Sequence, residues 1–511
     1  MKEKNYVNHP WIHSNTIEKR RYQENIVATC LTGNTLVVIP TGMGKTSIAA
    51  MVAAARLQKD MNSRIIILAP TKPLVNQHMK SFKKFIKLDP ENMLTITGEI
   101  PQDNRRYFYS KADMIFSTPQ TIRNDLNDRI LNLTDFSLLV IDEAHRSIGS
   151  YAYTDVAKKY SYQAKDPLLL ALTASPGSFH HKINEVKKAL YIKNVEIRSK
   201  DDEDVKPYVH PVEKEFIEVE LTEGMKEIQA FLQKSKKDII DKLMKWRIIS
   251  HPMISKSQIL KLQKDLAKKG TGIAYMSMSL LAELIKIDHA IMLLETQCIS
   301  ALKEYFDDLQ HKEDKASKRM LNNENIKKTI EKTEEMLNKG EENPKIEKLK
   351  EIIQQELENN KNTQIMIFVQ LRSTIRKIMS SLKGIKYASP VEFVGQAKKK
   401  GSGMNQKQQM QILEEFSMGF YNILVASSIG EEGLDIAETD TVIFYEAVPS
   451  AIRRIQRSGR TARTQAGKVI TLITKDTRDE IYHWSGYNKE KKMNKILYGM
   501  QKQRELTDFS K

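Results

Sequence analysis

Short apolar runs alternate with helix-like amphipathic segments through residues 1–205. The runs are nearly continuous hydrophobes, which is typical of parallel strands that helices cover on both faces. This pattern predicts one doubly wound α/β domain. Its predicted strands are 35–39, 64–68, 94–97, 114–117, 138–141 and 168–172.

The pattern changes after this first domain. Residues 199–207 are polar and charged and predict a linker, and residues 216–221 then alternate between apolar and polar positions like a strand. We therefore expect residues 206–222 to contain a linker and the first strand of a second domain. From 223 to 343, apolar residues recur at spacings of three and four, which predicts an all-helical insertion.

Continuous apolar runs return between residues 344 and 475 and predict a second doubly wound domain, followed by a helical segment at 476–511. The predicted strands of this domain are 365–369, 391–394, 422–426, 441–445 and 468–473. The predicted fold class is therefore α/β, with two doubly wound parallel-sheet domains and an all-helical insertion.

The composition points to a polyanionic partner. The chain of 511 residues has 81 Lys and Arg against 64 Asp and Glu, a formal charge of +17. Nucleic acid is the usual partner of such a chain, although a lysine-rich solvated surface would give the same composition. Cys30 and Cys298 are the only cysteines. We therefore expect neither a disulfide framework nor a zinc module, and a reducing compartment is favoured.

No stretch of the sequence predicts a membrane segment. The first six residues lack an apolar signal core, and no apolar run approaches the roughly 18 residues that span a bilayer. We expect a soluble, cytoplasmic, nucleoid-associated protein with no membrane partner.

A glycine loop, Pro40–Ser47, lies between a predicted strand and a predicted helix. Its two glycines let the backbone curl so that N–H groups face phosphate oxygens. Lys45 can then reach the β- and γ-phosphates of ATP, and the Thr46 hydroxyl can ligate Mg²⁺. Ile39 stands where the first glycine of such loops is usual, so the motif alone also fits a structural loop. The candidate ATP-binding residues are Thr41, Gly42, Gly44, Lys45, Thr46 and Ser47.

A pair of carboxylates, Asp142 and Glu143, follows the predicted strand 138–141. Open parallel sheets bind ligands at the carboxyl ends of their strands. Asp142 would hold Mg²⁺, and Glu143 would orient and deprotonate the attacking water. Such a pair can also merely cap the next helix. Together with the glycine loop, which precedes it by about a hundred residues, the pair favours ATP hydrolysis.

These residues, with Ala144 and His145, resemble the DEAH-box form of superfamily 2 helicases, and the other motifs of that group appear in sequence order along the chain. The resemblance implies RecA-like domains, adenine recognition by Arg20 and Gln23, and coupling of hydrolysis to domain movement by His145, Thr173 and Ser175. It implies nucleic-acid contacts by Thr71, Lys72, Thr118, Arg372 and Ser373, and ATP contacts by Gly433 and Asp435. Gln456, Arg460 and Arg463 have spacings that place them on one helical face, from which the arginines could reach the γ-phosphate. A surface helix with salt bridges would show the same spacing.

Longer stretches narrow the resemblance to the archaeal Hef helicase, a relative of the Fanconi anaemia M-type and Mph translocases. They are Val394–Ala397, Gly430–Ile436, Phe444–Arg453 and Thr477–Ser485. The resemblance implies a thumb-like insertion and ATP-dependent action on forked or branched DNA during repair and stalled-fork processing. Ala462 replaces the usual glycine of the family. No Glu-Arg-Lys-x-x-x-Asp signature occurs, so we expect no nuclease activity from this chain and a possible nuclease or clamp partner in trans.

Two other functions share the same motor motifs. One is a duplex-RNA-stimulated ATPase of the RIG-I-like kind, which the lack of zinc-binding cysteines disfavours. The other is an ATP-gated clamp that binds nucleic acid without unwinding it. Strand displacement on forked DNA separates a motor from a clamp, and comparing DNA with RNA as activators of the ATPase separates the two enzymes.

Overall fold

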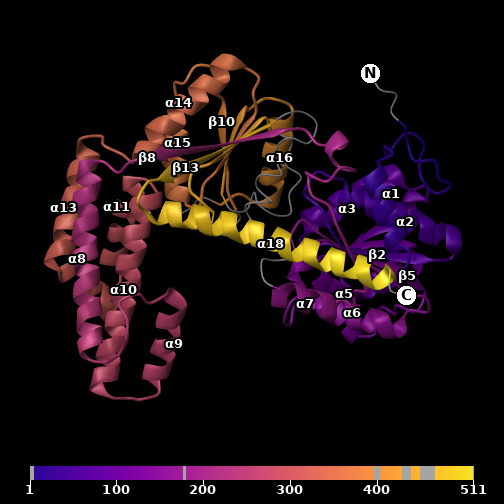
Figure 1. The fold of residues 1–511 in the computed structure, drawn as a ribbon, viewed down its shortest axis with the longest axis horizontal. Helices are drawn as coiled ribbons and strands as arrows, with labels where there is room; N and C mark the ends of the chain where they lie inside the picture. Colours follow the sequence, from indigo (N-terminus) through magenta and orange to yellow (C-terminus); the bar gives the residue numbers. More distant parts are fainter. Residues whose placement is uncertain are drawn as a thin grey trace.

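A computed structural model of the chain describes residues 5–175, 180–395, 403–427, 439–448, 450 and 467–509. Two sheet domains lie apart along the longest axis, and a bundle of helices projects from the second of them (Figure 1). A long helix, α18 (Arg478–Phe509), runs from the second sheet domain across to the first. None of the helices in the described part of the chain combines the length and the apolarity that crossing a membrane requires.

The first domain contains a seven-stranded sheet in the order β3-β4-β2-β5-β6-β1-β7, and all of its strand pairs are parallel. Its strands are β1 (Thr35–Val38), β2 (Arg64–Leu68), β3 (Met93–Ile96), β4 (Met114–Ser117), β5 (Phe136–Ile141), β6 (Leu169–Thr173) and β7 (Asn194–Ile197). Alternate strand residues enter two separate cores, one on each face of the sheet. The doubly wound α/β fold predicted from the continuous apolar runs is confirmed.

Helices cover both faces of this sheet. One face packs against α1 (Arg21–Cys30), α2 (Lys45–Lys59) and α3 (Lys72–Phe85). The opposite face packs against α4 (Gln102–Lys111), α5 (Pro119–Asn127), α6 (Ala152–Gln163) and α7 (His180–Ala189). The polar stretch 199–207 folds back onto this domain, because Val205 is fully buried in the core beside α1–α3 and Arg198 pairs with Asp204 at 3.0 Å.

The second sheet has the order β10-β11-β9-β12-β13-β8, again with parallel pairs. Its strands are β8 (Val212–Val219), β9 (Ile365–Phe368), β10 (Pro390–Phe393), β11 (Ile423–Ala426), β12 (Thr441–Phe444) and β13 (Gly467–Thr474). Helices α14 (Pro344–Asn359) and α15 (Arg372–Ser381) cover one face, and α16 (Gln406–Ser417) covers the other. The second doubly wound sheet predicted from the sequence is thereby confirmed.

The segment between β8 and α14 is helical, as predicted. It contains α8 (Glu223–Lys245), α9 (Lys256–Ala267), α10 (Gly272–Thr296), α11 (Ile299–Gln310), α12 (Lys315–Asn322) and α13 (Glu324–Asn338). Side-chain N-caps mark where five of these helices begin, since Thr222, Ser255, Thr271, Asp314 and Asn323 each accept a hydrogen bond from a backbone N–H of the first turn. The apolar faces of the helices form a core of their own.

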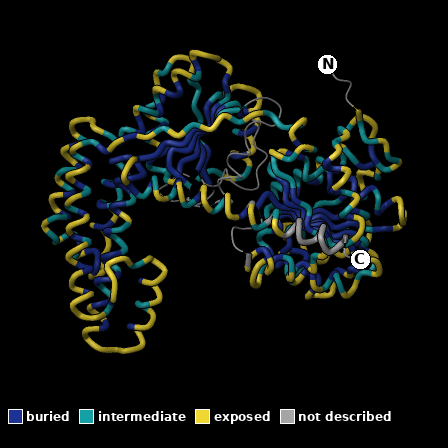
Figure 2. Tube along the Cα trace, in the orientation of Figure 1, coloured by how far each residue is buried: buried dark blue, intermediate teal, exposed yellow. Residues whose placement is uncertain are grey.

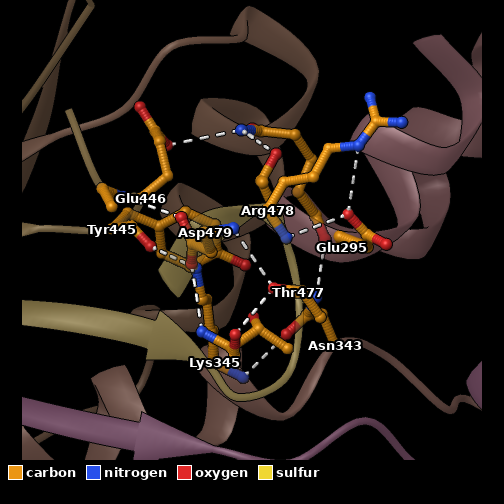
Figure 3. A network of polar contacts seen from close by, with 12 residues as sticks. Glu295, Asn343, Lys345, Tyr445, Glu446, Thr477, Arg478 and Asp479 are labelled. Carbon is orange, nitrogen blue, oxygen red and sulfur yellow. Dashed lines mark hydrogen bonds and ion pairs between the residues drawn. The ribbon is translucent and has the colours of Figure 1, made fainter. Parts of the chain in front are cut away.

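The bundle, the second sheet and α18 meet at a buried polar junction (Figure 3). Lys345 of α14 and Asp479 of α18 form an ion pair in which neither side chain is exposed. Lys345 also donates to the Tyr445 carbonyl at 3.0 Å, while Asp479 accepts from the Ala447 and Thr474 amides at 2.9 and 3.1 Å. Each buried charge therefore has an opposite charge and at least one further hydrogen-bond partner.

The far half of α18 docks on the first domain (Figure 1). Met493 is 2% exposed and lies in the core that α5–α7 cover, with Ile496 and Tyr498 packed against the same core. The Tyr498 hydroxyl donates to the Asp202 carboxylate at 3.1 Å. Because α18 starts at the junction described above, one continuous helix joins the two sheet domains.

Candidate ATP-hydrolysis site

The glycine loop joins β1 to α2 at the carboxyl edge of the first sheet. Gly42 and Gly44 have φ angles of +83° and +77°, which a side chain would strain. Gly44 is the N-cap of α2, and no side chain caps this helix. The first N–H groups of α2 therefore lack helical acceptors and are available to an anion such as phosphate.

Two residues of α1 hold this loop. The Tyr22 hydroxyl and the Gln23 amide nitrogen both donate to the Met43 carbonyl, at 2.8 and 3.1 Å. A Cβ atom on Gly44 would lie 2.3 Å from the Gln23 amide nitrogen, so any other residue there would require Gln23 to shift. Gln23 thus contacts the loop backbone in this structure, and its role in adenine recognition stays a prediction. Arg20, the other predicted adenine contact, pairs with Glu18 at 2.8 Å.

Ile39 stands where such loops usually have their first glycine. The Ile39 side chain is fully buried in the core, and its carbonyl accepts a hydrogen bond from Lys45 Nζ at 3.3 Å. Thr46 and Ser47 lie in the first turn of α2. The Thr41 hydroxyl is buried and has no hydrogen-bond partner among the described residues. An unsatisfied buried hydroxyl beside a phosphate-type loop is what a bound ligand would complete.

Asp142 and Glu143 follow β5 directly, on the same sheet edge as the glycine loop. The Asp142 carboxylate accepts from the Glu143 amide at 2.9 Å and lies 2.8 Å from His78 Nε2. Burial alone would raise the pKa of Asp142. The hydrogen bond and charge of His78, together with the charge of Lys45, outweigh burial and lower this pKa below its ordinary value. Asp142 is therefore an anion that can hold a cation.

Glu143 has a left-handed backbone, with φ +50°, which is uncommon for a residue with a side chain. One of its carboxylate oxygens, Oε2, is buried and makes no hydrogen bond within the described part of the chain, although it lies 3.2 Å from His145 Nδ1. The role of Glu143 as a general base stays a prediction.

A chain of contacts leads from Glu143 toward the second domain. His145 Nδ1 lies 3.2 Å from the Thr173 hydroxyl, which donates to the Ser175 carbonyl and accepts from the Ser175 amide, both at 3.1 Å. The Ser175 hydroxyl in turn donates to the Met493 sulfur of α18 at 2.8 Å. All three predicted coupling residues therefore lie in one contact chain that reaches α18.

The donors present fit Mg²⁺ held together with ATP. No group of three or more His, Cys, Asp or Glu side chains suited to a metal occurs among the residues that the structure describes. Mg²⁺ is commonly bound through one or two protein oxygens plus substrate phosphates. Thr46, at the start of α2, and Asp142, at the end of β5, are such a minimal set.

The predicted nucleic-acid contacts also lie where strands end. Thr71 and Thr118 are the N-caps of α3 and α5, after β2 and β4, and the Thr71 hydroxyl is a second buried group that lacks a partner in the described structure. Lys72 forms an ion pair with Glu99. Arg372 donates to the Gly395 carbonyl at 2.8 Å at the start of α15, and Ser373 follows it.

Other predicted residues fall outside the described residues. They are the ATP contacts Gly433 and Asp435 and the set Gln456, Arg460 and Arg463. Their roles stay predictions from the sequence.

Three contacts were not predicted: His78 on Asp142, Tyr22 on the glycine loop, and Met493 on Ser175. A signal for His78 existed, because Val75, His78 and Phe82 have the spacing of one buried face of α3. A histidine on an otherwise apolar face needs a polar partner. No comparable signal pointed to Met493, which is 318 positions from Ser175.

Family models match most of the chain. A DEAD/DEAH box helicase model matches residues 20–183, and a helicase conserved C-terminal domain model matches residues 344–465. Between them, residues 224–340 match a model described as an ATP-dependent RNA helicase helical bundle.

Individual proteins are similar over nearly the whole chain. A protein of Methanocaldococcus jannaschii named as an ATP-dependent RNA helicase is 37% identical over 97% of this chain and 63% of its own length. The ATP-dependent DNA helicase fml1 of Schizosaccharomyces pombe is 35% identical over 91% of this chain and 58% of its own length. The chain thus spans about three-fifths of each of these relatives.

A solved structure agrees with the sequence relatives. The crystal structure of the Pyrococcus furiosus Hef helicase domain is 43% identical, with a TM-score of 0.71, and the match covers 91% of this chain and 98% of that domain. The matched region of this chain includes both sheet domains and the helical bundle. The chain belongs to the Hef helicase family, a member of the DEAD/DEAH box helicases.

Proposed function

We propose that this chain is the ATP-driven motor of a DNA helicase or translocase that acts on forked or branched DNA. The observation that carries the proposal is the contact chain from Glu143 through His145 and Thr173 to Ser175 and α18. It joins a candidate hydrolytic base to a helix that is rooted in the second domain. We assign residues 1–205 and 344–475 as the motor domains and residues 223–343 as the nucleic-acid-contacting insertion.

The roles at the site follow from its geometry. The N–H groups at the start of α2 and Lys45 would bind the ATP phosphates. Thr46 and Asp142 would hold Mg²⁺, which when bound neutralises charge on the β- and γ-phosphates. Glu143 Oε2, which makes no hydrogen bond among the described residues, would accept the proton of the attacking water. A change in charge at Glu143 would then act on His145, whose Nδ1 lies 3.2 Å from Glu143 Oε2.

The distribution of charge in the insertion supports contact with a DNA arm. We define the insertion tip as residues 242–276, which comprise the end of α8, all of α9 and the start of α10. Its only acidic residue is Asp265, whereas residues 277–343 have 14 acidic and 10 basic residues. The basic residues of the tip are Lys242, Lys245, Arg247, Lys256, Lys261, Lys264, Lys268 and Lys269. The tip is largely exposed and lies at the far end of the bundle from the second sheet (Figures 1 and 2).

Charge reversal at the tip is expected to remove the preference for forked over linear DNA. Lys261, Lys264 and Lys268 are exposed, so changing all three to Glu should leave the core intact. Each lost phosphate contact lowers the slope of log affinity against log salt by about 0.9, so the slope should fall by about 2 to 3. The measurement is binding to forked and linear DNA across a salt series.

Lys312, Lys315 and Lys318 provide the matched control, because they are exposed residues of the same insertion outside the tip. Their reversal to Glu should leave fork preference unchanged. A tip variant that is folded, hydrolyses ATP and still prefers forks would show that the insertion only spaces the two domains.

The choice between DNA and RNA needs its own experiment, because the two curated relatives carry different names. We expect forked DNA to stimulate ATP turnover more than single-stranded, duplex or RNA activators of equal length. Binding should show little base preference and weaken steeply with salt, by about 10³-fold between 50 and 200 mM for six phosphate contacts. Stronger stimulation by duplex RNA would favour the RNA-dependent ATPase. ATP-gated binding without strand displacement on forked DNA would favour the clamp.

A further inference from the structure

His78 contacts the carboxylate that we assign to Mg²⁺. Its Nε2 atom lies 2.8 Å from Asp142 Oδ2, and the two side chains are 7% and 9% exposed. The other ring nitrogen, Nδ1, is buried and has no hydrogen-bond partner among the described residues. The ring therefore makes one polar contact there, and that contact is to Asp142.

The other contacts of Asp142 fix its backbone and one carboxylate oxygen, and His78 contacts the second carboxylate oxygen. The Glu143 amide donates to Oδ1 at 2.9 Å, and the Asp142 backbone is fixed by the Tyr153 hydroxyl on its carbonyl at 2.7 Å and by its own amide on the Leu68 carbonyl at 2.9 Å. With Oδ1 bound to the adjacent amide, the contact with His78 prevents the carboxylate from rotating. Hydrogen bonds to a metal-binding carboxylate commonly orient it and support metal affinity.

His78 also belongs to a helix that begins at a predicted nucleic-acid contact. Thr71 is the N-cap of α3 and Lys72 is its first residue, so His78 follows within two helical turns, about 9 Å along the axis. The buried Thr71 hydroxyl lacks a partner within the described structure. An α-helix moves as a rigid unit over this length, so a displacement of its first turn would reach His78.

We propose that His78 is a positioning residue that links strand contact at the start of α3 to the orientation of Asp142. It makes Mg²⁺-dependent nucleotide binding, and the stimulation of ATP turnover by nucleic acid, depend on one imidazole contact. The stimulation by nucleic acid rests on the proposed function, whereas the effect of His78 on Mg²⁺-dependent nucleotide binding does not require nucleic acid.

Two amide substitutions separate positioning from packing. A glutamine amide nitrogen lies close to the place of Nε2 and an asparagine amide nitrogen close to that of Nδ1, so His78→Gln keeps the donor to Asp142 and His78→Asn loses it. Both place a polar amide in the same buried space. Phe82→Leu is the matched control, because Phe82 is fully buried on the same face of α3 without contacting Asp142 through a polar atom.

The experiment measures ADP affinity with Mg²⁺ and with EDTA, and ATP turnover with and without forked DNA. His78→Asn is expected to reduce the gain in affinity from Mg²⁺ by about 10-fold or more and to lower the DNA stimulation ratio. His78→Gln should retain most of both quantities, and Phe82→Leu should retain both. Thermal unfolding of each variant shows whether it is folded.

Equal Mg²⁺ gains for wild type and folded His78→Asn would overturn the proposal, as would equal losses for the Asn and Gln variants. If His78→Asn does not fold, His78→Leu replaces it as the donor-free variant, with the same expectations. A wild-type ATPase that nucleic acid does not stimulate would refute the proposed function instead, and the Mg²⁺ measurement would still decide the role of His78.

Discussion

Replacing Glu143 with Gln is expected to lower ATP turnover by about 10² to 10⁴-fold while ATP and DNA still bind. The amide has the shape of the carboxylate but cannot accept the proton of the attacking water. Glu143 Oε2 makes no hydrogen bond among the described residues and lies 3.2 Å from His145 Nδ1, on a residue with a left-handed backbone. The measurements are steady-state ATP hydrolysis and equilibrium binding of ATP and forked DNA.

Two further variants serve as a comparison and a control for this result. Lys45→Ala should lose turnover mainly through weaker nucleotide binding, because Lys45 would contact the phosphates rather than the water. Glu185→Gln should leave turnover unchanged, because this exposed carboxylate accepts a hydrogen bond from the Gly149 amide and is not among the predicted site residues. Normal turnover in Glu143→Gln would mean that another group activates the water.

Removing one partner of the buried pair Lys345–Asp479 is expected to cost about 3 to 5 kcal/mol of stability. Lys345→Met leaves the Asp479 charge buried, with only the Ala447 and Thr474 amides to stabilise it. The pair stands at the junction of the second sheet, the helical bundle and α18 (Figure 3). Urea unfolding followed by tryptophan fluorescence measures the effect, since Trp484 lies on α18 near this junction.

The control is an exposed pair on the same helix. Lys348 and Glu351 lie 2.8 Å apart with side chains 41% and 66% exposed, so Lys348→Met should cost less than about 1 kcal/mol. Equal costs for the two lysines would show that the junction does not depend on its buried charges. The double variant Lys345→Met/Asp479→Leu should recover only part of the loss, because it leaves two buried amides unpaired.

Strands could be predicted from the sequence where both faces are buried, and less well at sheet edges. The run 64–68 became β2 with the same bounds. β7 was not predicted, because Asn194–Ile197 alternates between half-buried and buried positions as an edge strand does. β8 was predicted only from residue 216, since Glu213, Lys214 and Glu215 read as polar although they pair with β13.

The residues of the candidate site also fall into those that the sequence predicts and those that it does not. The glycine loop and the carboxylate pair are local motifs, so their residues and order were visible in the sequence. The contact of His78 with Asp142 spans 64 positions, and that of Ser175 with Met493 spans 318. Such contacts depend on how helices pack over the sheets, which spacing along one segment does not specify.

Docking of α18 on the first domain constrains how the chain can be shortened in the laboratory. Met493, Ile496 and Tyr498 fill part of the core face that α5–α7 otherwise cover. A recombinant fragment that ends after β13, or one restricted to residues 5–205, would expose this apolar surface to solvent. Such fragments are expected to aggregate or to capture other apolar segments. Solubility of the isolated first domain would therefore improve on adding residues 478–509 as a separate peptide.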